Sequence, residues 1–354
     1  MAMKVSSTYP ATWLAEVGPQ ARRAEELGYD NTGTGEMAHD PMILAAAAAL
    51  ATETIEIGTL AIAFARAPMV LAMGAWDLQQ ATGGRFSLSL GSQVKGHIQR
   101  RFGMPWSAPA PRMRDYIRTL HAIWDSFETG EKPDYVGETY QYTLMNPLFY
   151  PGPSGYPRPK VLLAAVGEKM TRVAGEVADG VLPHGFTTDR YMREVFLPNV
   201  GKGLERGGRT WQDIEVSAGG FTIYGDDESE IEQKREALRQ PISFYGSTRS
   251  YHDVFRLHGW EDLGKQLHSM SLQGKWEEMK GVIPEDVLHE FAQSSTYDNL
   301  PRFVAEHREY ASRMQFEMPV DTPAQRERFQ HILREVQAVE TPCVPRELAA
   351  LDPA

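Results

Sequence analysis

Glu36 and His39 lie in the stretch TGTGEMAHDP (32–41) and carry the side chains that proton-transfer chemistry needs. A carboxylate can accept a proton, and an imidazole changes its charge close to neutral pH. Both residues follow a β-rich run, YDNTGT (29–34). In a parallel α/β fold, ligands bind where strands end. The spacing therefore favours a catalytic pair, with a salt-bridged loop acid and a hydrogen-bonded loop imidazole as the structural alternatives.

The same stretch also matches a dinucleotide-binding fingerprint. Gly33, Gly35 and Ala38 fit G-x-G-x-x-[GA], in which a helix begins within the motif and faces the pyrophosphate. Here the nearest helix start is Asp40-Pro41, with aspartate as the N-cap and proline in the first helical position. That start comes seven residues after Gly33, too late to cradle a phosphate at the glycines. We therefore expect Asp40 to be a structural cap and the glycines to end a strand.

A phosphate site is better placed in LLAAVGEKMTRVAGEVADG (162–180), which predicts a buried strand, a glycine turn and an amphipathic helix. The N–H groups of Gly167, Glu168, Lys169 and Met170 would be unpaired at the helix N-terminus, where the helix dipole favours an anion. An ordinary turn between a strand and a helix has the same pattern.

Two further strand ends offer ligand contacts. In RFSLSLGSQVKGH (85–97), Gly91 and Ser92 would let a flat ligand approach the backbone. His184 ends the run GVLPH (180–184) and is either a substrate contact or a hydrogen-bonded rim residue.

These residues need a fold that gathers strand ends, and the sequence predicts one. Helical spacing of apolar residues is clear in 113–127, 168–178 and 329–336. Eight β-rich runs alternate with such patterns: 3–8, 29–34, 55–62, 85–91, 160–166, 180–184, 214–224 and 313–318. Eight strand–helix units predict an α/β protein with a (β/α)8 (TIM) barrel, and a doubly wound parallel sheet is the alternative.

Three connections are long, at about 92–110, 130–158 and 245–298. Strand–helix alternation resumes after each of them. We therefore expect one barrel domain over residues 1–354 with these segments as loop insertions.

Composition limits the class of partner. The net charge of −11 argues against a nucleic-acid surface and against an anionic membrane. The chain has one cysteine, Cys343, which excludes internal disulfides and cysteine-cluster metal sites and suits a reducing compartment. The N-terminus has no signal-peptide core, and no apolar run reaches 18 residues. We expect a cytoplasmic protein with no metal and a small-molecule substrate.

Seven segments, in this order, resemble the luciferase-like monooxygenase superfamily, and most closely the branch that uses the reduced deazaflavin coenzyme F420 in place of FMN. They are AEELGYD (24–30), GEMAHDP (35–41), ALATETIEIGTLAIAFARAP (49–68), LQQATGGRFSLSLGS (78–92), RFGMPW (101–106), AAVGEKMTRVAGEVADG (164–180) and HGFTTDRY (184–191). The resemblance covers about residues 4–340. It implies a (β/α)8 barrel, a homodimer, and a tricyclic ring bound at the carboxyl-terminal mouth.

The resemblance also implies roles for the residues that match its motifs. Leu60-Ala61 would form a non-prolyl cis peptide and a bulge under the ring. The ring edge and side chain would contact Gly91, Ser92, Gln93 and His97. The phosphate turn would comprise Ala164, Ala165, Val166, Gly167, Glu168 and Lys169, with Met170 beside it.

Glu36 matches an acidic position of the family, but this chain departs from the pattern at the next residue. Many members have a proton-transferring histidine there, and this chain has Met37. His39 either takes over that role or is only a loop residue. Trp13, Met37, Phe64 and Trp106 are expected to form apolar walls or to pack in the core.

The resulting hypothesis is hydride transfer between C5 of the deazaflavin and a small organic substrate, with Glu36 or His39 moving the accompanying proton. The cofactor supplies the redox chemistry, and the protein supplies position and electrostatics. An FMN-dependent monooxygenase is the first alternative. A non-catalytic flavin-binding barrel is the second.

Overall fold

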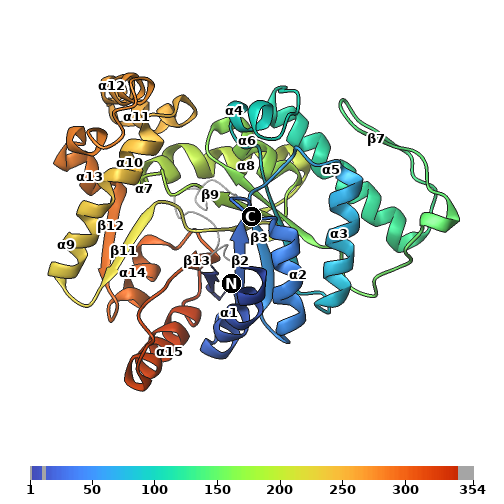
Figure 1. Ribbon diagram of the computed structural model, residues 1–354, viewed down its shortest axis with the longest axis horizontal. Coiled ribbons are helices and arrows are strands. Elements are labelled where there is room, and N and C mark those ends of the chain that lie inside the picture. The colour runs from blue at the N-terminus through green and yellow to red at the C-terminus, as the bar shows by residue number, and fades with distance from the viewer. Residues whose placement is uncertain (1, 10–12, 342–354) are drawn as a thin grey trace.

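The computed structural model describes residues 2–9 and 13–341, so Cys343 lies outside the described residues. Eight parallel strands form one nearly closed barrel, in the order β10-β9-β8-β5-β3-β2-β1-β13 (Figure 1). The strands are β1 (Lys4–Thr8), β2 (Asn31–Gly35), β3 (Glu56–Leu60), β5 (Phe86–Gly91), β8 (Lys160–Ala165), β9 (Gly180–Pro183), β10 (Glu215–Val216) and β13 (Arg313–Gln315). A bridge between Ser217 and Arg313 joins the two end strands. The predicted α/β (β/α)8 barrel is confirmed.

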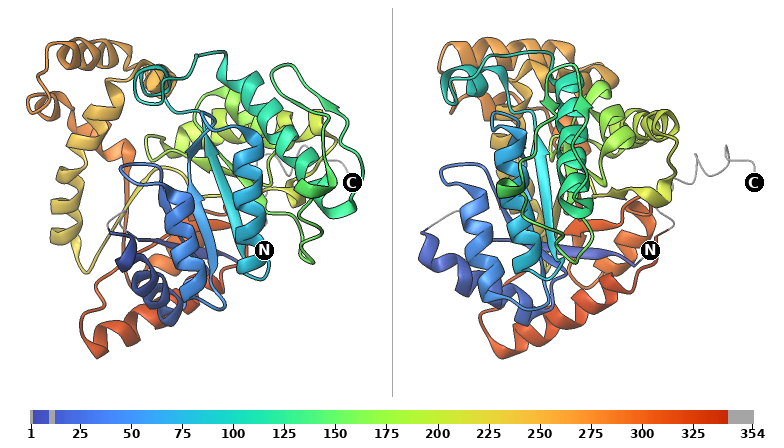
Figure 2. Two further views of the ribbon diagram at one scale, coloured as in Figure 1. Left: turned by 45° about the vertical axis from the view of Figure 1, so that its right-hand side comes forward. Right: turned by 90° about the vertical axis from the view of Figure 1, so that its right-hand side faces the viewer.

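Helices cover the outside of the barrel (Figure 2). They are α1 (Leu14–Leu27), α2 (Pro41–Ala51), α3 (Pro68–Ala81), α5 (Pro109–Thr129), α6 (Glu168–Val177), α8 (Leu197–Gly207), α14 (Leu300–His307) and α15 (Pro323–Gln337). Their ends follow local chemistry. Thr322 and Gln325 form a capping box at the start of α15, and Gly28 ends α1 with a positive φ of 95°. No described helix is long and apolar enough to cross a membrane.

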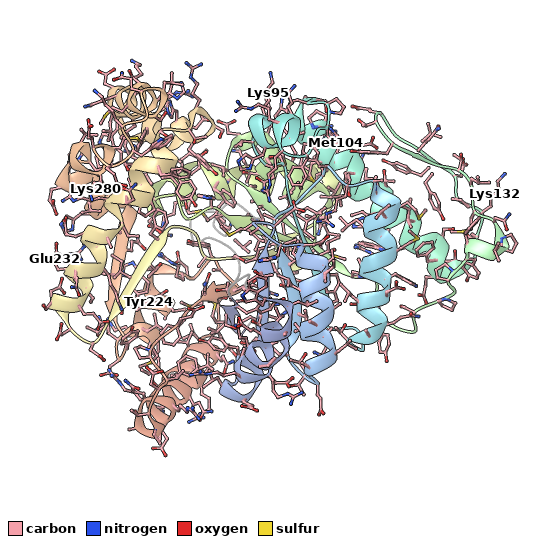
Figure 3. The ribbon with its side chains drawn as sticks, in the orientation of Figure 1. Lys95, Met104, Lys132, Tyr224, Glu232 and Lys280 are labelled. Carbon is pink, nitrogen blue, oxygen red and sulfur yellow. The ribbon has the colours of Figure 1, made fainter. Side chains whose placement is uncertain are left out.

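The remaining elements lie in the longer connections. Between β5 and β8 are α4 (Lys95–Arg100), the hairpin β6 (Tyr135–Val136) and β7 (Gln141–Tyr142), and η1 (Pro147–Phe149). This connection extends as an arm beyond α3 and α5; Lys132 is labelled on it in Figure 3. Between β9 and β10 are α7 (Asp189–Tyr191), η2 (Met192–Phe196) and η3 (Trp211–Asp213).

Between β10 and β13 the chain builds a group of helices beside the barrel, together with a small sheet (Figure 1). This part comprises β11 (Phe221–Gly225), α9 (Glu228–Ala237), α10 (Arg239–Gly246), η4 (Arg249–Tyr251), α11 (His252–His258), α12 (Glu261–Leu272), η5 (Met279–Val282), α13 (Glu285–Phe291) and β12 (Ala292–Thr296). β11 and β12 pair in parallel outside the barrel.

The single strand expected at 214–224 is therefore wrong. The barrel strand ends at Val216, and β11 begins only at Phe221. Two glycines separate them. Gly220 has a φ of 82°, and a Cβ on Gly219 would lie 2.7 Å from Met192 Sδ. The chain turns here because only glycine fits both positions.

The strand register fixes which side chains face the barrel interior, because side chains alternate along a strand. Glu215 pairs with Gly180, and Gly180 with Leu162. Gly33 pairs with Gly58, and a Cβ on Gly33 would lie 2.3 Å from the Gly58 carbonyl oxygen. Gly33 of the TGTG stretch thus allows β2 and β3 to lie close together where it faces Gly58.

Charged residues at the strand starts form the floor of the barrel. Arg313 is 5% exposed, and its guanidinium donates to Glu56 at 2.8 Å and to Glu215 at 2.9 Å. Lys4 bridges the same two carboxylates at 3.3 and 3.0 Å. Lys160 reaches Glu215 at 2.6 Å. This network links β1, β3, β8, β10 and β13 across the barrel axis.

The floor predicts an acid-dependent stability. Burial raises the pKa of Glu56 and of Glu215, but the charges of Arg313 and Lys4 outweigh it and hold both values below the ordinary 4.5. A carboxyl with a depressed pKa in the folded state loses its stabilising contribution as the pH falls. The free energy of unfolding should therefore decline below about pH 4.5.

Arg313→Met should lower the free energy of unfolding by about 3–5 kcal/mol at pH 7, because two buried carboxylates lose their main cation. It should also flatten the decline below pH 4.5. Urea unfolding at several pH values measures both effects. An Arg313→Met protein with wild-type stability and wild-type acid dependence would contradict this account of the floor.

Candidate active site

The mouth of the barrel is lined by small side chains at the strand ends. By the strand register, Gly35, Leu60, Gly91, Ala164 and Leu182 face inward near the carboxyl ends of five strands. All except Gly91 are partly exposed although they lie around the barrel axis, and Leu60 is 38% exposed. A surface of small and apolar groups suits a flat ring that lies across it.

A bulge interrupts the third strand at the mouth. Gly58 pairs with Ser87, and Ile62, the first residue of β4 (Ile62–Ala63), pairs with Leu90. Four steps along one strand thus oppose three along its neighbour (62 − 58 against 90 − 87), which defines a one-residue bulge. The bulge expected at Leu60-Ala61 is confirmed.

The cis peptide expected between Leu60 and Ala61 is wrong: no peptide bond among the described residues is cis. Ala61 instead has a φ of +50°, the left-handed conformation that a residue with a Cβ rarely adopts. This conformation accommodates the extra residue. A Cβ on the facing Gly91 would lie 3.1 Å from Ala61 Cβ. Gln93, two residues further, also has a positive φ of 52°. Such a conformation costs about 1–3 kcal/mol and persists where neighbours enforce it.

Glu36 is one of the groups that hold the bulge. Its carboxylate is buried and accepts a hydrogen bond from the Ala63 N–H at 2.8 Å. The guanidinium of Arg66 donates to the other oxygen at 2.7 and 3.2 Å. Both carboxylate oxygens are therefore occupied. The geometry makes Glu36 a positioning residue, which corresponds to the salt-bridged acid left open as an alternative.

Arg66 also reaches Asp40, 3.0 Å from its Oδ2. The other oxygen of Asp40 accepts the N–H of Met42 at 2.9 Å and caps α2, as the sequence predicts. Sequence reasoning missed Arg66. Along the sequence, the one indication of its role is its position two residues before Pro68, where α3 begins. Its partners lie 26 and 30 residues away along the chain.

His39 and Met37 lie in the loop between β2 and α2, and both are exposed. The side chain of Arg101, at the end of α4, donates a hydrogen bond to the Met37 carbonyl oxygen. This contact ties the loop to α4. His39 Nδ1 and Nε2 have no partner among the described residues, so the imidazole is available to a ligand.

The segment after β8 has the geometry of an anion site. Gly167 is the N-cap of α6, and no side chain caps this helix. Lys169 is exposed in the first turn, and the Tyr191 hydroxyl donates to the Val166 carbonyl oxygen at 3.2 Å. Space beside Gly167 is open up to Asp253 Oδ2, which lies 4.0 Å from the position of an added Cβ. The N–H groups of Glu168 and Lys169 are left to bind an anion, whereas the Met170 N–H, expected to be unpaired, donates to the Gly167 carbonyl oxygen at 3.1 Å. The nearby Asp253 carboxylate would repel a phosphate bound here.

Other parts of the expected turn are structural. Ala165 and Met170 are buried in the core, whereas Ala164 is partly exposed. Glu168 is exposed and pairs with Arg172 at 2.8 Å. On the opposite side of the mouth, Ser92 and Gln93 are half-buried, and His97 is exposed on α4.

The expected apolar walls divide into core and surface residues. Phe64 is fully buried, with the Arg112 guanidinium 4.5 Å from its ring centroid and Trp106 at 6.3 Å. It packs in the core, the alternative left open by the sequence. Trp13 is 74% exposed at the start of α1, and Met37 is 71% exposed.

His184 lies at the end of β9, between Tyr245 and Tyr251. Its ring centroid is 4.4 Å from that of Tyr245 and 4.8 Å from that of Tyr251. Burial lowers the pKa of His184 to about 4, so the ring is neutral at pH 7.

The site thus combines a bulged third strand, a mouth of small residues and an uncapped helix after the fifth barrel strand. Residues 3–312 match the luciferase-like monooxygenase family model, and the chain belongs to that family.

Relatives by sequence include an uncharacterized protein of Mycobacterium tuberculosis. It is 42% identical over 299 residues, which cover 84% of this chain and 88% of the relative. A 5,10-methylenetetrahydromethanopterin reductase of Archaeoglobus fulgidus is 23% identical over 287 residues, covering 78% of this chain and 81% of the reductase.

Among solved structures, the coenzyme F420 dependent tetrahydromethanopterin reductase of Methanopyrus kandleri has a TM-score of 0.71 at 19% identity, covering 94% of this chain and 97% of that one. The oxygenating constituent of the 3,6-diketocamphane monooxygenase of Pseudomonas putida, solved in complex with FMN, has a TM-score of 0.64 at 18% identity. It covers 97% of this chain and 100% of that one. These likenesses support the fold.

Glu36→Ala should lower the free energy of unfolding by about 2 kcal/mol, because the buried Ala63 N–H and the Arg66 guanidinium lose their acceptor. Glu36→Gln keeps one acceptor oxygen and should lose less. Thermal and urea unfolding of both variants test this. The assignment of Glu36 to the bulge is contradicted if both variants unfold like the wild-type protein.

Proposed function

We propose that this chain is an oxidoreductase that transfers a hydride between a bound deazaflavin, coenzyme F420, and a small organic substrate. The observation that carries the proposal is the bulge at Ala61 facing Gly91 beneath an open mouth of small residues. The solved structure of a coenzyme F420 dependent tetrahydromethanopterin reductase supports the choice of coenzyme. When bound, the deazaflavin supplies the hydride chemistry.

The chain's own residues would bind and orient the coenzyme. Gly91, Leu60 and Ala61 would back the ring, and Ser92 and Gln93 would contact its edge. The first-turn N–H groups of α6 and the Lys169 ammonium would bind the phosphate. Lys95, Arg100 and Arg101 on α4 add positive charge at one side of the mouth, in a chain whose net charge is −11.

His39 is assigned the proton transfer, because its ring nitrogens are free and exposed whereas both oxygens of Glu36 are occupied. An imidazole can accept a proton on its unprotonated ring nitrogen and, once protonated, release one again. His39 would thus perform the task that Met37, with a thioether, cannot.

An FMN-dependent monooxygenase is the second candidate, and the FMN-bound fold neighbour favours it. Both coenzymes are flat rings with a phosphate-bearing side chain, so the same mouth and turn can accept either. A barrel that binds a flavin without turnover is the third candidate; its support is the methionine at position 37.

A homodimer is also proposed, through α2 and α3. α2 has the sequence PMILAAAAALA and is apolar on all sides. Ile43 and Leu50 on α2, and Val70 and Met73 on α3, are exposed. A second copy with the same face would cover these side chains. Light scattering should give twice the 39.6 kDa chain mass, and Leu50→Glu should reduce it to one chain.

Titration with each coenzyme tests the proposed function. Oxidised deazaflavin and FMN have different visible absorption spectra, and each is titrated separately with the protein. Saturable binding of the deazaflavin at micromolar concentration, with weaker binding of FMN and no oxygen consumption by the reduced complex, is the expected result. Tighter binding of FMN together with oxygen consumption would replace the proposal with the monooxygenase.

Gly91→Val tests the position of the ring, because the valine side chain would enter the space between the bulge and the ring. It should weaken deazaflavin binding at least tenfold. Gly281→Val serves as the comparison, since no atom lies within 4 Å of a Cβ added there.

A further inference from the structure

The hydrogen bond between Phe186 and His184 fixes the proton of the imidazole. The Phe186 N–H donates to His184 Nδ1 at 2.9 Å. A nitrogen that accepts a hydrogen bond carries no proton, so the neutral ring must carry its proton on Nε2. His184 is therefore a neutral Nε2–H donor with a fixed tautomer.

This donor is unused within the chain. No described residue accepts a hydrogen bond from His184 Nε2, and Nε2 is not among the buried polar atoms that lack a partner. His184 Nε2 is thus accessible to solvent or to a ligand. His184 directly follows β9, and the alternation of that strand, if continued by one residue, places it on the same side as Leu182, which pairs with the inward-facing Ala164. We infer that Nε2–H is available at the mouth of the barrel.

Aromatic rings continue from His184 to the protein surface. The Tyr245 ring on α10 contacts Phe244 at 5.3 Å between centroids, and Phe244 contacts Trp276 at 6.0 Å. Phe244 is 49% exposed and Trp276 is 43% exposed. We call His184, Tyr245, Tyr251, Phe244 and Trp276 the aromatic series. Neighbouring exposed rings of this size are typical of a surface that binds an apolar molecule.

Buried rings behind the aromatic series hold the helices beside the barrel in place. Phe186 lies tilted against Phe291 at 4.5 Å and edge-on to Phe255 at 5.3 Å between centroids, and all three are fully buried. Phe186 also contacts Tyr251 at 5.7 Å and Tyr245 at 6.5 Å. The anchoring of this part of the chain therefore does not need the exposed rings of Phe244 and Trp276. Their exposure is left for a ligand.

The chemistry of the aromatic series selects the ligand. Burial keeps His184 neutral at pH 7 and raises the pKa of Tyr251 to about 12, and Phe244 and Trp276 have no ionisable group. Arg249, Asp253 and Arg256 lie on the neighbouring η4 and α11, and the last two pair with each other at 2.9 Å. A neutral donor among aromatic rings matches a neutral acceptor on an apolar body.

We propose that the aromatic series binds an uncharged apolar or aromatic carbonyl compound, whose oxygen accepts the hydrogen bond of His184 Nε2–H and whose body lies against Tyr245, Tyr251 and Phe244. This assigns a substrate class to the mouth and rests on the proposed function. His184 acts here as a substrate-orienting donor. It holds its proton, since a neutral imidazole is far too weak an acid to release it.

The probe for this site is 6-propionyl-2-dimethylaminonaphthalene, an aromatic ketone whose fluorescence depends on polarity and on hydrogen bonding at its carbonyl. Without any coenzyme, the wild-type protein should bind it saturably. His184→Phe keeps the ring and removes the donor, so the affinity should fall about tenfold and the emission of the bound probe should move to shorter wavelength. Phe244→Ala and Trp276→Ala should each weaken binding several-fold.

Matched controls use the same residue types elsewhere. His331→Ala removes an exposed histidine of α15, and Phe149→Ala removes an exposed phenylalanine of the arm. Both should bind the probe like the wild-type protein. Circular dichroism and thermal unfolding of all variants check that each is folded.

Equal probe affinity in the wild-type protein, His184→Phe and Phe244→Ala would overturn the proposal. Tighter binding of a trimethylammonium analogue than of the ketone would overturn it as well, since that result defines a cation site. Coenzyme titration of His184→Phe separates this proposal from the proposed function. Failure of the proposed function would remove coenzyme binding from both the wild-type protein and the variant, whereas failure of the present proposal would leave coenzyme binding intact and abolish only the difference in probe affinity between them.

Discussion

The ion pairs of the buried Arg313 guanidinium with Glu56 and Glu215 close the barrel, and the site depends on that closure. β10 has two residues and β13 has three, and a single bridge at Ser217 joins them. Backbone pairing at this seam is thus minimal. The side-chain network of Arg313, Lys4 and Lys160 spans the seam at the floor. The inward-facing charged residues of this network lie at the floor, whereas the inward-facing residues at the mouth are small or apolar.

A second network works at the opposite end. Glu36, Arg66 and Asp40 connect the loop after β2 with the bulge after β3 and with the start of α2. These contacts offset the cost of the left-handed conformation at Ala61. Glu36, which the sequence suggests as a proton carrier, therefore stabilises the bulge instead. Two imidazoles at the mouth have ring nitrogens without a partner among the described residues: His39 in the loop and, through Nε2, His184 at the end of β9.

Much of this could be predicted from the sequence, because periodicity and capping are local. The barrel strands and the Asp40 cap follow from residues that are neighbours along the chain, whereas the position of the bulge was implied by the family resemblance. The break between Val216 and Phe221 was missed because an alternating apolar run reads as one strand whether or not two glycines turn it. The Glu36–Arg66 pair and the burial of Phe64 depend on contacts between distant segments, which periodicity does not encode. The cis peptide came from the resemblance, and the structure replaces it with a positive φ.

The proposed position of the deazaflavin is across the mouth, over the bulge and against the start of α6. Hydrogen–deuterium exchange of the protein with and without coenzyme F420 measures which segments the coenzyme covers. Bound in this position, the coenzyme should slow exchange in 60–64, 91–97 and 164–171 and leave exchange in α15 unchanged. Slower exchange confined to other segments, or none at saturating coenzyme, would contradict this position.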